Sequence, residues 1–411
     1  MRIRESVAAT HKGNRGHNED AVLRLPKVPV FAVADGMGGP GAGDIAAGIV
    51  LDIVKQRSDL LNTANLKVGD DRSTSARLGL GRVFDDLFNA SSREVQREST
   101  RLQRPGMGST LCVATIVRNY AYVAHVGDSR AYLWREGRLT KLTEDHTIAE
   151  LHLRRGKITR EEYEQSPDRR VLYQVLGAGI EVDSDLAEVR LAGGDLLLLT
   201  SDGIPRAIHD DLISTSIKPD DLKGTLQRIF EAALAACAPD NLAAVLLGFE
   251  SEQGDEPIEA VLDVMRDVFL FKDMTQPELL TVAPYLEEIV YDTGATIVTE
   301  GEVSQGLYIV VAGAVRMTRG KTTLLDVKPG GYFGELALAR QPAKLATVRA
   351  MSATRVFVLT RDRFHELLRQ KPELGARVAV ALLEAVGERL RDMTDRISAV
   401  ERAVRGELKG A

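Results

Sequence analysis

The sequence of 411 residues has little of several residue types whose abundance would indicate a class of protein. It contains two cysteines, Cys112 and Cys237, far apart and without the spacing of a metal or disulfide motif, so we expect both to be buried thiols. Lysine and arginine (53) are outnumbered by aspartate and glutamate (59). The formal net charge of -6 therefore gives no basic footprint for nucleic acid.

Long hydrophobic runs are also missing. No stretch approaches the roughly 20 apolar residues of a membrane span, and the first residues, MRIRESVAATHKGNRG, lack the apolar core of a signal peptide. We therefore expect a cytoplasmic protein without membrane contact. Hydrophobic residues (44%) and charged residues (27%) occur in ordinary globular proportions, and the length favours two domains.

Residues 1–249 are rich in short apolar, β-branched runs punctuated by glycine, such as TLCVATIV and DLLLLTSDG, which predict strands. Between them, apolar residues recur at intervals of three and four around 44–56, 78–98, 147–156 and 222–237, which predicts helices. Strands and helices mixed in this way favour an antiparallel core covered by helices, an α/β sandwich.

A polar, acidic segment at 250–257, ESEQGDEP, has the composition of a linker. Residues 258–392 then show strand-like segments separated by glycine turns, which indicates a small β-barrel flanked by helices. Residues 393–411 continue a long helical pattern. The chain as a whole is predicted to be of the α+β class.

Several aspartates share a local pattern. Apolar strands run directly into Asp-Gly or Asp-Asn at Asp35, Asp202 and Asp240, and Asp128 lies in HVGDSR. Taken alone, each Asp-Gly is simply a turn. Carboxylates at strand ends are held by a rigid sheet, however, and clustered oxygen ligands suit hard divalent cations. Four gathered carboxylates would be costly without a cation, so a metal site is favoured if they converge, which spacing alone does not show.

Eight segments in order resemble the PPM family, the metal-dependent protein phosphatases of the 2C type. They are GNRGHNED, VFAVADGMGG, GMGSTLCVA, AYVAHVGDSRAYL, LTEDHT, YQVLG, LLLLTSDGI and DNLAAVLL. The resemblance spans residues 1–249. It implies a four-layer α/β/β/α sandwich with a metal cluster at one end, between the two sheets.

The resemblance also implies that two Mn²⁺ or Mg²⁺ ions are bridged by Asp35, the central catalytic residue. The carbonyl of Gly36, together with Asp202 and Asp240, would complete the shell of one ion. Two metals about 3.5–4 Å apart share a water, lower its pKa toward about 7 and direct it at phosphorus. The implied reaction is hydrolysis by a metal-bridging water, without a covalent intermediate.

Four more positions take roles from the same resemblance. Glu19 and Asp20 would hold waters on the other ion, and Asp128 matches the ligand of a third, weaker ion. Arg15 matches the arginine that grips the substrate phosphate. A guanidinium suits this task because its planar fork pairs with two phosphate oxygens.

The segments IVTEGEVSQGLYIVVAGAVRM and GGYFGELALARQPAKLATVRA resemble the cyclic-nucleotide-binding domain, a double-stranded β-helix. The implied nucleotide contacts are Gly334, Glu335, Leu336, Lys344 and Thr347, with Glu335 on the ribose hydroxyl. Lys344 stands where an arginine usually pairs with the cyclic phosphate, and lysine keeps the charge but loses the fork. We therefore expect weakened binding of cyclic AMP or cyclic GMP, with another anionic ligand or none as alternatives.

The C-terminal pattern alternates apolar residues by three and four, which is a heptad seam. Its members are Leu383, Val386, Leu390, Met393, Ile397, Val400, Val404 and Leu408. The seam favours a parallel two-helix coil and hence a homodimer. A single helix packed on the barrel is the alternative.

Together these patterns predict a protein serine/threonine phosphatase that acts on the phosphorylated product of a kinase and is regulated or localised by its second domain. A phosphoprotein- or nucleotide-binding module with little catalytic activity is one alternative. A phosphatase for small molecules is another, because the site reads a phosphate and not its carrier.

Overall fold

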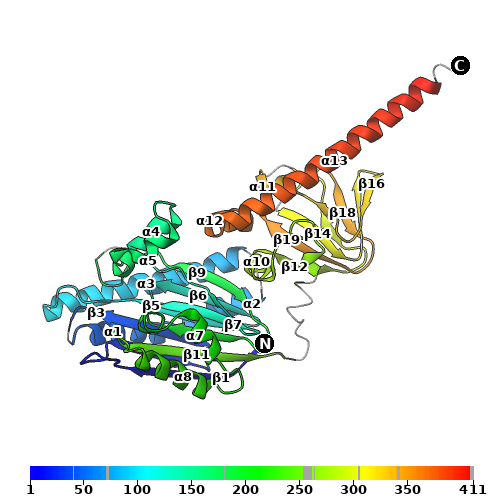
Figure 1. Ribbon diagram of the computed structural model, residues 1–411. Coiled ribbons are helices and arrows are strands. Elements are labelled where there is room, and N and C mark those ends of the chain that lie inside the picture. The colour runs from blue at the N-terminus through cyan, green and yellow to red at the C-terminus, as the bar shows by residue number, and fades with distance from the viewer. Residues whose placement is uncertain are drawn as a thin grey trace. The chain divides into compact units, whose positions relative to one another are not determined.

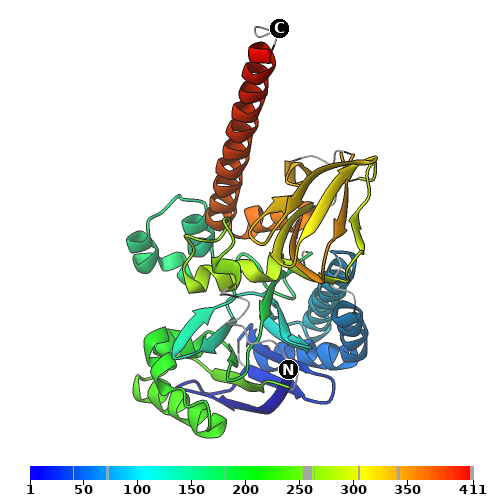
Figure 2. The ribbon, with the colours of Figure 1, turned by 90° about the vertical axis from the view of Figure 1, so that its right-hand side faces the viewer.

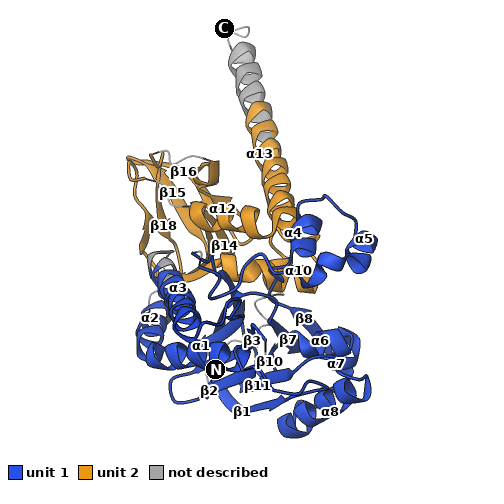
Figure 3. Ribbon diagram, turned by 90° about the vertical axis from the view of Figure 1, so that its left-hand side faces the viewer, with its two compact units in different colours: residues 1–257 blue, residues 258–411 orange. Residues whose placement is uncertain are grey.

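The computed structural model divides into two compact units, Met1–Pro257 and Ile258–Ala411, coloured blue and orange in Figure 3. It describes residues 1–39, 41–70, 74–179, 181–252, 262, 264–303, 306–339 and 343–407. Within helices, the side chains of 69, 70, 74, 75, 77, 78, 392 and 395–407 are outside this description. Most of the segment expected to be a linker, 250–257, also lies outside the described residues.

The first sheet of unit 1 has the strand order β2-β3-β5-β6-β9, and its neighbouring strands are antiparallel. Its strands are β2 (Asp20–Leu25), β3 (Val30–Met37), β5 (Leu111–Val117), β6 (Tyr120–Val126) and β9 (Asp185–Arg190), and the short β4 (Gly108–Ser109) pairs with the end of β3. Three helices belong to its outer face: α1 (Gly43–Gln56), α2 (Ser58–Asp70) and α3 (Thr74–Leu102).

The second sheet of unit 1 has the order β1-β11-β10-β7-β8, and Figure 1 labels β1, β11 and β7 of these strands. Its strands are β1 (Arg2–His11), β11 (Leu242–Glu250), β10 (Leu196–Thr200), β7 (Arg130–Arg135) and β8 (Arg138–Lys141). The helices α6 (Gly203–Ala207), α7 (Asp210–Ser216) and α8 (Leu222–Ala235) pack on its outer face. Between β8 and β9 lie α4 (Ile148–Arg154), α5 (Arg160–Gln165) and the 3₁₀ turn η1 (Pro167–Arg170).

Side chains of unit 1 are sorted into three apolar cores by the two-residue period of its strands. On β3, Val30 and Ala32 face the helices α1–α3, whereas Phe31 and Val33 face the second sheet. The third core joins the outer face of the second sheet to α6–α8. Every residue of β5, β6 and β10 is buried because both faces of these strands are covered. The four-layer α/β/β/α sandwich is thus confirmed.

Two details of unit 1 differ from expectation. The helices α2, α5, α6 and α7 were not predicted from the sequence, and in α2 a buried residue such as Leu61 has the exposed Leu60 and Leu66 as neighbours on the helix. Cys112 is buried as expected, but the prediction for Cys237 is wrong, because this residue is exposed. Cys237 follows the end of α8 with φ +58°, a position that closes the helix rather than entering the core.

Unit 2 contains two four-stranded antiparallel sheets, of order β12-β19-β14-β17 and β13-β18-β15-β16. Their strands are β12 (Glu287–Tyr291), β13 (Thr296–Val298), β14 (Gly306–Ala312), β15 (Val315–Arg319), β16 (Thr322–Val327), β17 (Tyr332–Phe333), β18 (Thr347–Ala350) and β19 (Thr354–Thr360). Valines and aromatic residues from both sheets, including Tyr308, Phe333 and Val356, form one core. The β-rich barrel expected here is therefore present.

The helices of unit 2 flank this barrel. They include α10 (Gln276–Val282), the 3₁₀ turn η2 (Ala283–Tyr285), α11 (Leu336–Ala339), α12 (Arg361–Gln370) and α13 (Pro372–Glu407). The long helix α13 runs past the barrel of its own unit, as Figure 2 shows in dark orange to red. Across the described part of the chain, we find no helix with the length and apolar character needed to cross a bilayer.

Candidate functional site

The expected acidic cluster starts with two strands of unit 1 that run antiparallel. Asp20 is the first residue of β2, and it lies directly opposite Asp35 near the end of β3. Glu19 immediately precedes β2, and its carbonyl accepts a hydrogen bond from the amide of Gly36 (3.1 Å). The antiparallel register therefore brings Glu19, Asp20, Asp35 and Gly36 to one end of the first sheet.

The other three expected ligands come from connections between strands. Asp128 lies between β6 and β7, Asp202 joins β10 to α6, and Asp240 precedes β11. All three carboxylates act on the titration of Asp35, so the structure places them around that residue. Convergence of these acids, which the sequence alone could not show, is thus present in the fold.

Close backbone contacts shape this end of the sandwich. A Cβ on Gly36 would lie 1.9 Å from the carbonyl oxygen of Gly43, the first residue of α1. A Cβ on Gly43 would in turn lie 2.8 Å from the carboxyl carbon of Glu19. The two glycines therefore allow the start of α1 to pack against the metal-ligand candidates, with the Glu19 carboxylate beside the amide of Gly43.

The electrostatics of the cluster show how unfavourable it is without a compensating charge. Burial, followed by the charges of Asp20, Asp202, Asp128 and Asp240, raises the pKa of Asp35 well above its usual value. Burial raises the pKa of Asp20 to about 7 and that of Asp128 to about 8, again with help from neighbouring carboxylates. Gathered acids of this kind are normally stabilised by protons or by cations.

Two buried oxygens in the cluster have no hydrogen-bond partner among the described residues, Glu19 Oε1 and Asp202 Oδ1. Buried polar atoms are rarely left without a partner in folded proteins. The candidate metal-ligand atoms at this site are carboxylate or carbonyl oxygens, the ligands that hard divalent cations such as Mg²⁺ and Mn²⁺ prefer. The residues present therefore fit a divalent metal centre.

Two arginines approach the acids. Arg15 donates from Nη2 to Asp240 Oδ2 (2.9 Å) and from Nε to the Pro239 carbonyl (3.1 Å), and half of its side chain (53%) is exposed. Arg206, which sequence reasoning missed, donates from Nη1 to both Asp202 Oδ2 (2.6 Å) and Asp240 Oδ2 (2.9 Å). Its only sequence signal was the four-residue spacing from Asp202, which one helical turn brings onto the same face.

In unit 2, the residues expected to contact a nucleotide flank the short helix α11. Gly334 has φ +81°, and a Cβ there would lie 2.6 Å from the Gly306 carbonyl oxygen, so glycine is needed. Lys344 is nearly buried, with Nζ 3.7 Å from Glu302 Oε2. Thr347 Oγ1 accepts a hydrogen bond from the amide of Glu300 (3.1 Å).

The acidic residue of this region has a partner that the sequence did not suggest. Arg389 of α13 donates from Nη1 to Glu335 Oε1 (3.2 Å) and from Nη2 to the Tyr332 carbonyl (2.8 Å). Its guanidinium also lies 4.1 Å from the centre of the Tyr332 ring. Leu336, at the start of α11, is by contrast half exposed. The carboxylate expected to take a ribose hydroxyl is thus already engaged by α13.

Comparison with known proteins shows the family to which unit 1 is similar. A family model described as Protein phosphatase 2C matches residues 2–152. The "Putative protein phosphatase 2C-type" of Streptococcus pyogenes is 31% identical over 245 residues, which cover 58% of this chain and 94% of that protein. The chain belongs to the protein phosphatase 2C family. A second model, described as Cyclic nucleotide-binding domain, matches residues 288–371.

Other members of the protein phosphatase 2C family show similar matches. "Serine/threonine protein phosphatase PstP" of Mycobacterium tuberculosis is 32% identical over 232 residues, 56% of this chain. The chain spans 42% of the length of that relative. The crystal structure of PstP/Ppp from the same organism has a TM-score of 0.51 at 30% identity and covers 60% of this chain and 99% of its own. The Streptococcus agalactiae serine/threonine phosphatase reaches 0.54 at 26% identity, with coverage of 60% and 99%.

The phosphatase 2C unit contains a second group with the spacing of metal ligands. His125, His146 and Asp185 offer atoms that lie within 4.8 Å of one another. The amide of Gly127 donates to His146 Nδ1 (3.3 Å), so Nε2 carries the proton of the neutral ring and faces Asp185 Oδ2 (3.2 Å). His125 Nε2 lies 2.7 Å from the Glu144 carbonyl oxygen. These hydrogen-bond partners within the protein favour a structural role for both histidines.

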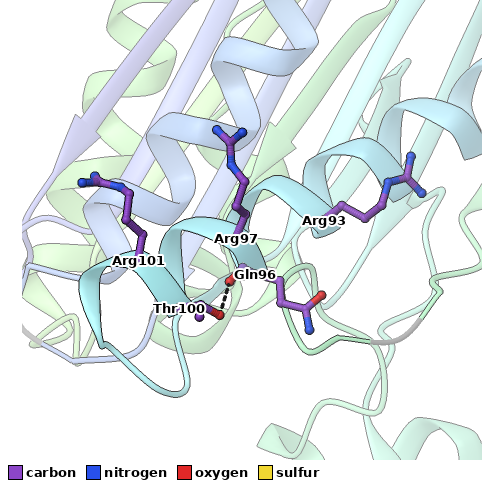
Figure 4. A pocket seen from close by; sticks show the side chains of 5 residues that line it. All are labelled: Arg93, Gln96, Arg97, Thr100 and Arg101. Carbon is purple, nitrogen blue, oxygen red and sulfur yellow. Dashed lines mark hydrogen bonds between the residues drawn. The ribbon is translucent and has the colours of Figure 1, made fainter.

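The same unit carries a basic row on the exposed face of α3, formed by Arg93, Arg97 and Arg101 (Figure 4). Gln96 and Thr100 line the shallow pocket beside it, and Thr100 Oγ1 donates to the Gln96 carbonyl (3.0 Å). Arg97 and Arg101 pair with glutamates one turn away on the same helix. The row is therefore a solvated helix face stabilised by local ion pairs.

Proposed function

We propose that the chain is a metal-dependent protein serine/threonine phosphatase whose active site is the carboxylate cluster of residues 1–249. The observation that carries this proposal is the pair of buried, unpartnered oxygens, Glu19 Oε1 and Asp202 Oδ1, within a convergent set of acids. Relatives named as serine/threonine phosphatases, among them PstP of Mycobacterium tuberculosis, support the same activity.

The acids of the cluster would hold two divalent ions, Mn²⁺ or Mg²⁺. Asp35 would bridge them, and Asp202, Asp240 and the Gly36 carbonyl would bind one. Glu19 and Asp20 would hold the waters of the other. When bound, two such ions supply a water of lowered pKa as nucleophile and stabilise charge on the phosphoryl group.

Arg15 would bind the substrate phosphate. Its side chain is half exposed and its only described side-chain partner is Asp240, so one guanidinium edge can turn to an incoming anion. A planar fork pairs with two phosphate oxygens and orients the phosphorus relative to the acids. The Asp240 contact would hold the guanidinium in place while the phosphate binds.

The second unit would regulate or localise this activity. We assign residues 258–392 to a cyclic-nucleotide-binding-like domain and residues 393–411 to a helical extension, with 250–257 as the linker. A regulator acts by binding one conformational state better than another, so a ligand of this domain would have to change access to the acidic cluster by such a preference. Exposed Leu383, Leu390 and Met393 on α13 support the proposed homodimer, and Val386 of the same seam is half-buried. The seam residues from position 397 onward lie outside the described side chains.

The test is release of phosphate from a phosphothreonine peptide across a Mn²⁺ titration of the full chain. We expect metal-dependent turnover in the wild type and a loss of at least about 10³-fold in Asp35→Asn, since the bridging ligand is removed. Asp86→Asn, on the exposed face of α3, is the matched control and should keep wild-type turnover. Equal turnover in the wild type and Asp35→Asn, or none in either, would instead support a binding module.

A further inference from the structure

Arg206 occupies a position inside the acidic cluster that the family motifs did not assign. Asp202 ends the loop after β10 and α6 starts at the next residue, so Arg206 lies one turn further along. Its Nη1 lies 2.6 Å from Asp202 Oδ2 and 2.9 Å from Asp240 Oδ2. A single guanidinium nitrogen thus joins two residues that the proposed function makes ligands of the same ion.

The contacts of Arg206 leave the ion-binding side of Asp202 free. Arg206 takes Oδ2 of Asp202, while Oδ1 of the same carboxylate is buried without a partner among the described residues. Asp240 Oδ2 is shared by Arg206 and Arg15, and its Oδ1 accepts the amide of Asn241 (3.0 Å). The arginine therefore fixes one oxygen of each carboxylate and holds both groups in place.

The environment of Arg206 is that of an enclosed cation. Its side chain is 25% exposed, and its Nε is buried without a described partner. The carboxylates of Asp202 and Asp240 lie against its guanidinium, and Asp128 adds a further negative charge that acts on it. Asp128 is also the residue for which the sequence suggested a third, weaker ion.

The charges of the cluster balance with two divalent ions and no third. The cluster contains six carboxylates, those of Glu19, Asp20, Asp35, Asp128, Asp202 and Asp240. Two guanidinium groups, Arg15 and Arg206, leave four negative charges, which two divalent ions neutralise. A third divalent ion would overcharge the buried site and would meet Arg206 at close range.

We propose that Arg206 is a built-in cation that takes the place of a third metal ion beside Asp128, Asp202 and Asp240, so that this site holds two divalent ions and no more. The proposal rests on the proposed function, because it concerns the same metal centre. Arg206 acts through Asp202 and Asp240 and is therefore a positioning residue.

The experiment is a count of bound Mn²⁺ per full chain by equilibrium dialysis and atomic emission, up to millimolar free metal. We expect two ions in the wild type and one additional, weakly bound ion in Arg206→Gln, which removes the cation and leaves every acid in place. Arg206→Lys keeps the charge and should return the count to two. The control is Arg228→Gln. Arg228 lies on α8 and pairs with Asp221, and this variant should also bind two ions.

A second measurement is the melting temperature of the full chain, first without metal and then with Mn²⁺. Without metal, Arg206→Gln should lower the melting temperature by about 3 °C or more relative to the wild type, because Asp202 and Asp240 lose their counter-charge. Saturating Mn²⁺ should remove most of this difference. Arg228→Gln should show no such metal-dependent recovery.

The outcomes separate the two proposals. A wild type that binds two ions, with an unchanged count and an unchanged metal-free melting temperature in Arg206→Gln, overturns the role of Arg206 and leaves the phosphatase intact. Three ions in the wild type also overturn it, even if Arg206→Gln does not fold. A wild type that binds no ion and releases no phosphate overturns the proposed function and this inference together.

Discussion

Asp20 and Asp35 face each other across the antiparallel strands β2 and β3. Side chains at such opposed positions have Cβ atoms about 4.5–5.5 Å apart, and like charges there are destabilising. Asp20 is buried and Asp35 is half-buried at the same end of the sheet, and loss of solvent together with the neighbouring carboxylates raises the pKa of each carboxyl. The fold therefore builds a repulsion into the site that a bound cation, or a proton in its absence, must relieve.

The first prediction concerns stability of the metal-free protein. The folded-state pKa of Asp20 is raised from 3.8 to about 7, so the folded protein holds a proton that the unfolded chain has already lost at intermediate pH. Stability from this proton is fully present below pH 3.8 and is lost as the pH rises through 7. We expect the free energy of unfolding of unit 1 in EDTA to fall by roughly 2 kcal/mol between pH 5 and pH 8.

Urea unfolding at three pH values would measure how steeply the free energy of unfolding falls with pH. Asp20→Asn should make this fall shallower, and saturating Mn²⁺ should abolish it in the wild type, since the ions replace the proton as the compensating charge. A free energy that is flat or rises between pH 5 and pH 8 in EDTA would contradict the prediction.

The second prediction concerns the contact between α1 and the site. Gly43→Ala would place a methyl group 2.7 Å from Gly36 backbone atoms and 2.8 Å from the carboxyl carbon of Glu19. Because backbone cannot yield, the Glu19 carboxylate must move, and we expect Mn²⁺ affinity to fall at least about tenfold. Isothermal titration calorimetry would measure it. Gly48→Ala on the same helix has no atom within 4 Å of the added carbon and should bind Mn²⁺ as the wild type does.

The positions of the acids were predictable because each stands at a strand end within a recognisable segment, and strand ends are fixed by the burial pattern of β3, β10 and β11. The layers of the sandwich were predictable from the same burial patterns, because alternating and fully buried runs of apolar residues indicate strands. What the residues alone did not give was the convergence of these ends, since it depends on the register of two sheets.

Arg206 and Arg389 could not be predicted for a different physical reason. Arg206 is one turn along a five-residue helix, and nothing in the letters GIPRA shows that this turn faces inward. Arg389 contacts Glu335 across a separation of 54 residues, which only the packing of α13 on α11 determines. Cys237 was assigned to the core by its alanine-rich neighbours, yet the helix ends just before it.

The third prediction concerns Arg15. Because its fork is proposed to bind the phosphate, Arg15→Ala should lower kcat/KM for a phosphothreonine peptide by about 10²–10³-fold. Arg15→Lys should recover only part of the loss, since an ammonium binds one oxygen at a time. The half-exposed side chain contributes little to stability, so both variants should melt close to the wild type. Activity of Arg15→Ala within twofold of the wild type would rule out the assigned role.

The last prediction concerns the nucleotide pocket of unit 2. Lys344 is nearly buried beside Glu302, and Glu335 is engaged by Arg389, so the wild type should bind cyclic AMP and cyclic GMP weakly. Lys344→Arg restores a fork for the cyclic phosphate and should tighten binding about tenfold, the equivalent of about 1.4 kcal/mol. Lys328→Arg, an exposed position after β16, is the control for an added guanidinium.

Calorimetric titration of the full chain with both nucleotides would test this directly. Arg389→Ala should strengthen the effect of Lys344→Arg, because it frees the Glu335 carboxylate for the ribose hydroxyl. If neither variant binds a cyclic nucleotide more tightly than the wild type, the anion does not bind between Lys344 and α11. Among the ion pairs of the described residues, Arg389–Glu335 joins α13 to the segment beside the barrel, so the domain would then act through this contact rather than through a nucleotide.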